Sequence, residues 1–320
     1  PMPNRFRSPS EAVVICTRNR PRELERTLRS ITAVHSSSDV LLGVVDASDA
    51  EATEYNRRLL KSVDTLSSAH WRYTNEPSLA RQRNYALNQL PSSIEFVHFV
   101  DDDVTVQPGY FEALSEVLRT HQDVGGVGGV ILEKRSSPSS PVRTRFKQLF
   151  FLSHPQVGQV LPSGCTTSAQ HPFSTSGSGL RPTEWLSGCS STYRRALLEE
   201  TRFDDSLTGY AMLEDLDLSY RMSQVSRLVV QPRARLHHRR STQNRFDVEQ
   251  YNFTQTVHRR WFVEKHGEGV TPSLAYWWSV VGRIIALVTS SRGGRYDALR
   301  GFLRGIRTVL HRDHDLLRSE

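Results

Sequence analysis

The chain has few cysteines and no apolar run long enough to suggest a membrane anchor. Its three cysteines, Cys16, Cys165 and Cys189, are odd in number and widely spaced, which argues against a disulfide framework and against a cysteine-based zinc site. Unpaired thiols are typical of a reducing compartment, so we expect a cytoplasmic protein. The first residues are polar and rich in arginine and proline, where a secretory signal peptide would have an apolar core.

The charge of the chain is positive. Its 41 Lys and Arg against 34 Asp and Glu give a net charge of +7, which predicts an anionic partner such as a phosphorylated substrate, a membrane surface or a nucleic acid. No nucleic-acid-binding motif is present, so we expect no nucleic-acid partner. The length of 320 residues suits one large α/β domain with an appendage.

The first 130 residues alternate between apolar runs and amphipathic stretches. The runs predict strands over residues 12–17, 40–46, 71–74 and 96–100, and the stretches predict helices over residues 21–31, 51–66, 78–90 and 108–119. This βαβα succession predicts a doubly wound, Rossmann-like, mostly parallel sheet. Ligands bind beyond the carboxyl ends of the strands in such sheets, and Thr17, Asp46 and the acidic triplet after residue 100 all lie at such ends.

The second half of the chain is less regular. A glycine-loosened strand is predicted over residues 125–132, and residues 134–183 are rich in Ser, Pro and Gly, which predicts a long flexible loop. Periodic patterns then return and predict short strands over residues 185–189 and 228–231 and helices over residues 193–200, 214–222 and 247–266.

Two further helices are predicted over residues 272–289 and 295–310. The first contains Arg283 and is too short to be a good membrane span. The second has an apolar face opposite a face of arginines, which is typical of a helix that lies in a membrane interface; its apolar residues are Leu299, Phe302, Leu303 and Ile306. The alternative is a helical pair packed on protein, so we expect either a peripheral membrane contact or a homodimer through this region.

Three consecutive carboxylates, Asp101, Asp102 and Asp103, follow the apolar run of residues 96–100. Like charges at one strand end repel each other, and a hard divalent cation relieves that repulsion because it takes carboxylate oxygens as ligands. A solvated acidic turn is the alternative reading of the triplet alone.

Six segments, in this order, resemble the motifs of the family 2 glycosyltransferases of the GT-A fold. They are VVICTRNRP, VVDASD, SLARQRNYAL, FVHFVDDDV, WLSGCSSTYRR and LEDLDLSYRM, and they span about residues 12–222. The resemblance implies an inverting transfer of a sugar from a nucleoside-diphosphate donor to an acceptor hydroxyl, with Mn²⁺ or Mg²⁺ as cofactor. A UDP-sugar is the first choice of donor, with GDP- and TDP-sugars next, and the identity of the acceptor stays open between a glycan, a lipid-linked acceptor and a small molecule.

The resemblance assigns the donor side to the strand ends. It implies that Thr17, Arg18 and Asp46 hold the nucleobase and ribose of the donor. It also implies that Arg81, at a helix start, lies near the donor, where a guanidinium and free backbone N–H groups suit phosphate. For Asp46 and Arg81 the alternatives are a turn cap and a surface position.

The resemblance makes the acidic triplet the DXD motif of the family. It implies that Asp103 ligates the metal while Asp101 or Asp102 faces the ribose or sugar. His238, or its neighbour His237, is a further candidate metal ligand, although a histidine in so basic a segment also suits phosphate or solvent.

Glu214 and Asp215 resemble the Glu-Asp motif of the family, in which the aspartate is the general base. A base must lie beside the acceptor hydroxyl, opposite the leaving phosphate, and the resemblance gives that role to Asp215. It places Trp185, Gly188 and Glu214 on the acceptor side, where Trp185 could stack on a sugar ring. Helix-dipole stabilisation is the alternative for the two acids and core packing for Trp185.

Processive members of the family carry a Q-x-x-R-W motif and membrane spans. The segment VHRRW at residues 257–261 lacks the glutamine, so we expect a non-processive enzyme. The domain layout that follows is a GT-A catalytic domain with a C-terminal helical appendage. Its parts are a nucleotide-sugar-binding half (residues 1–133), an acceptor loop (134–183) and an acceptor half (184–246), which together make the catalytic domain (1–246), and then the helical region (247–320).

Other readings of the same residues exist. The sequence Asp101-Asp-Asp103-Val-Thr105 also fits the motif of haloacid-dehalogenase-type phosphatases, with Asp101 as nucleophile and Asp103 as acid/base, but that reading leaves the Glu-Asp motif unexplained. A sugar-nucleotide pyrophosphorylase would need a glycine-rich N-terminal loop, which is missing. A catalytically inactive, glycosyltransferase-like scaffold is the non-enzymatic alternative, and it has no need for both Asp103 and Asp215.

Overall fold

The computed structural model describes residues 9–34, 40–62, 67–132, 140–172, 179–241, 246–290 and 293–318. The chain forms two compact units, one of residues 1–134 and 169–243 and one of residues 135–168 and 244–320. The boundary at residue 243 lies close to the expected one at residue 246. Residues 135–168 group with the C-terminal helices, whereas we expected them within the catalytic domain.

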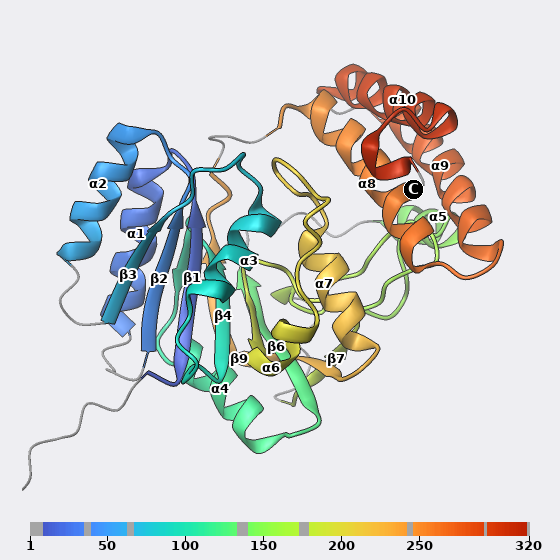
Figure 1. Ribbon diagram of the computed structural model, residues 1–320. Helices are drawn as coiled ribbons and strands as arrows, with labels where there is room; N and C mark the ends of the chain where they lie inside the picture. Colours follow the sequence, from blue (N-terminus) through green and yellow to red (C-terminus); the bar gives the residue numbers. More distant parts are fainter. Residues whose placement is uncertain are drawn as a thin grey trace, which may run out of the picture. The chain divides into compact units, whose positions relative to one another are not determined.

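Over the residues described, the first unit is built on a nine-stranded mixed sheet (Figure 1). Its strands run in the order β3-β2-β1-β4-β8-β6-β9-β5, with β7 also paired to β9. The strands β1, β2, β3 and β4 are mutually parallel, β6 and β9 are parallel, and β8 is antiparallel to both of its neighbours. The strand bounds are β1 Glu11–Thr17, β2 Val40–Asp46, β3 Ser67–Arg72, β4 Phe96–Asp101, β5 Val104–Val106, β6 Val124–Leu132, β7 Arg181–Thr183, β8 Ser191–Arg194 and β9 Arg227–His238.

Three helices of this unit, α1, α2 and α3, start where the sequence supplies a cap or a proline. Asp49 accepts a hydrogen bond from the backbone N–H of Ala52, Ser78 accepts one from that of Arg81, and Pro21 occupies a first helical position. The buried face of α1 carries Leu24, Leu28 and Ile31, as its spacing predicts. The helix bounds are α1 Pro21–Val34, α2 Ala50–Lys61, α3 Leu79–Gln89, α4 Tyr110–Thr120, α6 Arg195–Glu200 and α7 Glu214–Ser223.

The glycines of β6 make room for two buried tyrosines. A Cβ on Gly126 would lie 2.6 Å from the ring of Tyr193, and one on Gly129 would lie 2.7 Å from the ring of Tyr110. Tyr193 and Tyr110 are each 1% exposed. The glycine-rich run therefore serves packing at the centre of the sheet, because no larger residue fits there.

One strand prediction was wrong and another was too short. Residues 185–189 form no strand, because the N–H groups of Leu186 and Ser187 donate to the side chains of Ser219 and Gln170 and not to a neighbouring strand. The strand predicted over residues 228–231 continues to His238. Its basic second part alternates exposed arginines with buried Ala234 and Leu236, which is the period of a strand with one buried face.

The second unit is helical. Its elements are α5 (Pro141–Leu149), α8 (Val248–His266), α9 (Thr271–Val288), α10 (Arg295–His311) and the short 3₁₀ helix η2 (Asp315–Leu317). Helix α10 packs closely on α8, since a Cβ on Gly301 would lie 2.0 Å from the carbonyl oxygen of Glu249. Of the helices that the structure describes, none combines the length and apolar character needed to cross a bilayer.

A buried polar cluster surrounds Glu11 at the start of β1. The Glu11 carboxylate accepts hydrogen bonds from Ser115 at 2.7 Å and from Arg119, and it lies 3.0 Å from Nε2 of His98. Burial by itself would raise the pKa of Glu11. The interactions with His98, Ser115 and Arg119 outweigh burial and lower this pKa from 4.5 to about 2.

Glu11 therefore makes stability depend on pH. A depressed carboxyl pKa adds stability that is complete above the unfolded pKa of 4.5 and is lost as pH falls towards the folded pKa of about 2. The contribution is on the order of 3 kcal/mol. We expect urea unfolding of Glu11→Gln to show a flatter loss of stability through this acid window than the wild type, while the exposed control Glu51→Gln follows the wild type. An unchanged acid slope in Glu11→Gln would contradict the assignment.

Candidate active site

The predicted convergence of polar groups at one edge of the sheet is present. In the parallel pairs, Thr17 on β1 is the register partner of Asp46 on β2, and Cys16 on β1 is the partner of Asp101 on β4. The carboxyl ends of three adjacent strands therefore meet, which is where ligands bind in open α/β sheets.

Asp102 points into the protein. It is fully buried, and its carboxylate accepts the hydroxyl of Thr17 at 2.6 Å and lies 2.6 Å from Nη2 and 3.1 Å from Nε of Arg20. Burial, opposed by the charge of Arg20 and by the Thr17 hydroxyl, raises the pKa of Asp102 to about 7. Thr17 and Asp102, both expected on the donor side, are thus joined to each other, and Arg20, which the sequence reasoning missed, holds them.

Asp103 lies beside His238. Its Oδ1 is 3.1 Å from Nε2 of His238, and its Oδ2 accepts the backbone N–H of Ser241 at 2.9 Å. The pairing of β5 with β9 explains this contact, because Val104, next to Asp103, is the register partner of His238. His237 is exposed and lies near Gln107, so of the two candidate histidines it is His238 that faces the acidic triplet.

The charges of this pair reinforce each other. Burial acts to raise the pKa of Asp103, but the interactions with His238 and Arg20 outweigh it and hold that pKa below its usual range. Burial acts to lower the pKa of His238, but the interactions with Asp103, Cys189 and Asp101 raise it to about 11. In the absence of a metal ion the pair is therefore an ion pair.

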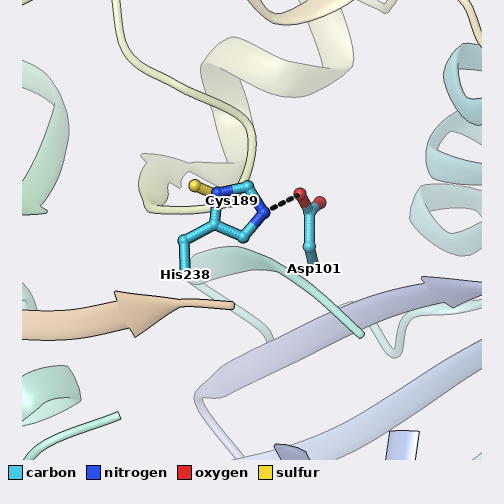
Figure 2. A group of neighbouring side chains, drawn as sticks. All are labelled: Asp101, Cys189 and His238. Atoms are coloured by element: carbon cyan, nitrogen blue, oxygen red, sulfur yellow. Dashed lines mark ion pairs between the residues drawn. The ribbon is translucent and has the colours of Figure 1, made fainter. Parts of the chain in front are cut away.

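Asp101 is the most accessible of the three acids. It is 30% exposed on its side chain, and its Oδ2 lies 3.8 Å from Nε2 of His238. Figure 2 shows the Asp101 carboxylate and the Cys189 sulfur on opposite sides of the His238 ring. The ligand atoms of these three residues lie within 4.8 Å of one another.

The donor set fits a divalent cation. His238, at the end of β9, lies between the Asp101 carboxylate of β4 and the Cys189 thiol, and the Asp103 carboxylate also contacts its ring. The 3.1 Å between Asp103 Oδ1 and His238 Nε2 matches the separation of about 3 Å between adjacent ligands of an octahedral ion with bonds near 2.1 Å.

Asp46 is an internal cap. It is fully buried, and it accepts hydrogen bonds from the backbone N–H of Ser48 and from Asn56, both at 2.9 Å, and lies 3.0 Å from His70. Burial acts to raise the pKa of Asp46, and these interactions lower it overall. The turn-capping alternative describes this geometry. Arg18 is exposed on the loop that follows Thr17.

Arg83, and not Arg81, lies in the site. Arg81 turns outward and donates to the carbonyl oxygen of Asp205 at 2.9 Å. Arg83 is buried; it lies 2.9 Å from Glu214 Oε1 and 3.4 Å from Asp101 Oδ1, and it donates to the carbonyl oxygen of Gly188 at 3.1 Å. The helical spacing distinguishes Arg83 from Arg81, because Arg83 lies on the same face of α3 as the buried Ala80 and Leu87, at i−3 and i+4.

The Glu-Asp motif forms the start of α7 and directly follows a loop with a strained backbone. Ala211 and Leu213 have φ of 49° and 73°, a region that costs a residue with a side chain of order 1–3 kcal/mol. After this loop, Asp215 accepts the backbone N–H groups of Gly188 at 2.9 Å and Leu216 at 2.8 Å. Asp217, two residues on, is buried against Arg221.

The acceptor-side segment is an irregular loop. A Cβ on Gly188 would lie 2.6 Å from Nη1 of Arg83, so glycine is required for the guanidinium to reach the carbonyl oxygen of Gly188. Trp185 is partly buried three residues earlier in the same loop. The structure therefore brings Gly188, Glu214 and Asp215 together around Arg83.

The comparison with family models identifies the chain. The family described as "Glycosyltransferase like family 2" matches residues 9–262. The chain belongs to this family. It is a glycosyltransferase, and the match leaves the phosphatase and pyrophosphorylase readings of the acidic triplet without support. A comparison with curated protein sequences gives no match.

Solved structures share the GT-A fold of this glycosyltransferase. GalNAc-T7 with UDP, GalNAc and Mn²⁺ aligns with a TM-score of 0.57 at 13% identity over 86% of this chain, which spans only 55% of that protein. Mannosyltransferase PcManGT from Pyrobaculum calidifontis, with GDP-Man and Mn²⁺, gives 0.58 at 14% identity over 96% of this chain and 89% of the other. S. aureus TarS 1–349 with UDP-GlcNAc gives 0.58 at 15% identity over 95% and 82%. The expected α/β GT-A fold is confirmed.

The glycosyltransferase should depend on Arg83 for stability. We expect Arg83→Ala to lower the free energy of unfolding by about 3–5 kcal/mol, because Glu214 is left buried without its counter-charge. The control Arg81→Ala, on the same helix, loses one hydrogen bond and about 1 kcal/mol. The double variant Arg83→Met, Glu214→Gln should recover part of the loss in chemical denaturation. Equal stabilities of Arg83→Ala and Arg81→Ala would contradict the role of Arg83.

Proposed function

We propose that this glycosyltransferase is an inverting, metal-dependent enzyme that moves a sugar from a nucleoside-diphosphate donor to an acceptor hydroxyl. The observation that carries the proposal is the position of Arg83, whose guanidinium contacts both Asp101 of the acidic triplet and Glu214 of the Glu-Asp motif. A single buried cation therefore links the acidic triplet to Glu214, the residue next to the proposed base Asp215.

The donor diphosphate binds at the edge formed by β4 and the end of β9. Asp103 and His238, with Asp101, would hold Mn²⁺ or Mg²⁺ there. When bound, the cation supplies Lewis-acid stabilisation of the charge that builds on the leaving nucleoside diphosphate. The Mn²⁺ in the GalNAc-T7 and PcManGT structures supports this assignment. Cys189, whose sulfur lies within 4.8 Å of a ring nitrogen of His238, would help to orient the imidazole.

The nucleoside binds along the loops after β1 and β2. Arg18 is exposed on the first loop, and Asn19 and Ser48 tie the two loops together through a hydrogen bond of 2.8 Å. Thr17 and Asp46 are buried, and they contribute by fixing the position of these two loops. A UDP-sugar is the donor that we favour, in line with the UDP and UDP-GlcNAc of the GalNAc-T7 and TarS structures, while the GDP-Man of PcManGT keeps a guanosine donor as the next choice.

Asp215 acts as the general base. The N–H groups of Gly188 and Leu216 fix the orientation of its carboxylate, and two of its roughly four lone-pair directions remain for an acceptor hydroxyl. Burial, opposed by the Gly188 N–H and by Arg83, raises the pKa of Asp215 and so makes it a stronger proton acceptor. As the acceptor oxygen attacks the sugar carbon, its proton passes to Asp215, and the bond from that carbon to the diphosphate breaks on the opposite face.

The acceptor side is completed by Glu214, Gly188 and Trp185. Glu214 is paired with Arg83, which it keeps facing Asp101. Trp185 lies in the loop that leads to Gly188 and offers a ring on which an acceptor sugar can stack. The Arg81 role that the family resemblance implies falls to Arg83 in this proposal.

The metal assignment can be tested with alanine variants of two adjacent histidines, His238 and His237. We expect UDP with Mn²⁺ to raise the melting temperature of the wild type, because binding to the native state stabilises it by mass action. His238→Ala should weaken Mn²⁺ binding by on the order of tenfold or more, measured by titration calorimetry, whereas His237→Ala should bind as the wild type does. Equal Mn²⁺ affinities of the two variants would count against a metal site at His238.

The base assignment is tested by Asp215→Asn. We expect a fall in kcat of about a hundredfold to ten-thousandfold, with donor binding retained, because the amide cannot accept the proton. Asp217→Asn, the same change two residues on, should lower the melting temperature but keep a turnover near that of the wild type. A wild type that turns over none of the UDP-, GDP- or TDP-sugars with Mn²⁺ would favour the inactive-scaffold alternative.

A further inference from the structure

One face of α9 is apolar and exposed along most of its length. Five of its residues are 39–66% exposed, namely Leu274, Trp278, Val281, Ile285 and Val288. At 3.6 residues per turn they fall within about 80° of the helix circumference and extend over about 21 Å. We call these five residues the α9 stripe. The opposite side of α9, with Tyr276, Ser279 and Val280, is buried in the second unit.

Helix α5 continues this surface. The indole N–H of Trp278 donates to the carbonyl oxygen of Leu149 at 2.8 Å, and its ring stacks on Phe150 at 4.8 Å. Val142, Arg145 and Leu149 follow a spacing of i, i+3 and i+7, which places them on one face of α5, and all three are exposed. The end of α5 is therefore seated on α9 through Trp278, with an exposed face that is partly apolar and partly basic.

The two segments that carry the stripe and α5 contain no acidic residue. Residues 140–168 contain no Asp or Glu, and neither do residues 269–296. The basic residues of these two segments include Arg143 and Arg145, both exposed on α5. An apolar stripe with a tryptophan, beside arginines and without carboxylates, is complementary to a surface that is apolar inside and anionic at its edge.

Helix α10, where the sequence pattern suggested a membrane contact, has part of its apolar face covered, while Leu303 stays exposed. Gly301 and Gly305 lie against α8, and Phe302 is buried. Arg304 and Arg312 form ion pairs of 2.8 and 2.9 Å with Glu249 and Glu264 of α8. The acids of α8 thus offset charge on α10, whereas α5 and α9 carry no acids of their own.

We propose that the α9 stripe and the exposed face of α5 form a docking surface for an anionic phospholipid bilayer. The helix would lie in the plane of the interface with its stripe in the acyl boundary, while Arg143 and Arg145 contact the headgroups. This surface lies within the second unit and uses none of the residues assigned to the donor or to the base, so it adds a site of attachment to the proposed transfer activity.

The test is flotation of the full chain with vesicles of phosphatidylcholine, with and without phosphatidylglycerol. We expect binding to the anionic vesicles that weakens as salt is raised. Val281→Gln, Ile285→Gln should lose vesicle affinity about tenfold or more, because two inserting apolar side chains become polar. Arg143→Gln, Arg145→Gln should lose the preference for phosphatidylglycerol. The matched control Leu303→Gln, Leu310→Gln changes two exposed leucines of α10 and should bind as the wild type does.

Several outcomes would overturn the proposal. They are no binding to anionic vesicles by a wild-type protein with a cooperative melting transition, equal binding by the α9 variant, and loss of binding in the α10 control. A concentration-dependent dimer that binds no vesicles, and that Val281→Gln, Ile285→Gln splits in light scattering, would assign the stripe to a second copy of the chain. Vesicle binding is measured without donor, metal or acceptor, so its result is independent of the transfer activity.

Discussion

The guanidinium of Arg83 lies buried among acceptors that come from distant parts of the chain. It contacts Glu214 at the start of α7, Asp101 at the end of β4 and the carbonyl oxygen of Gly188 in the loop between β7 and β8. It also lies over the rings of Phe99 and Phe203, 5.5 and 5.4 Å from their centroids. A buried charge is tolerated only when its partners are in place, so this one side chain couples the position of the strand end to that of the Glu-Asp motif.

The same principle explains how three consecutive carboxylates coexist. Asp102 pairs with Arg20, Asp103 pairs with His238, and Asp101 faces Arg83. Each acid thus has a cation from a different element: the loop before α1, the end of β9 and the middle of α3. The protein's own cations therefore relieve the repulsion within the triplet. Asp102 has a structural role, while Asp101 and Asp103 lie near His238.

In the second unit, two helices of similar length differ in how much of their surface is covered by their neighbours. Helix α10 is the more amphipathic in its charge pattern, yet glycines bring it into contact with the backbone of α8 and its arginines meet the acids of that helix. Helix α9 carries almost no charge, and one side of it is buried while the stripe remains exposed. The distribution of acids among neighbouring helices, and not the pattern of any single helix, distinguishes the packed surface from the open one.

Local patterns determined much of this protein. The period of apolar residues located most strands and helices of the first unit, and the strand-end positions of Thr17, Asp46 and Asp101 predicted where the site would be. Contacts between distant segments decided the rest. The sequence could not distinguish Arg83 from Arg81, His238 from His237, or the buried Asp102 from its accessible neighbour Asp101. Each choice depends on which side of a strand or helix meets which partner, and a charged side chain goes where its counter-charge is, often more than a hundred residues away.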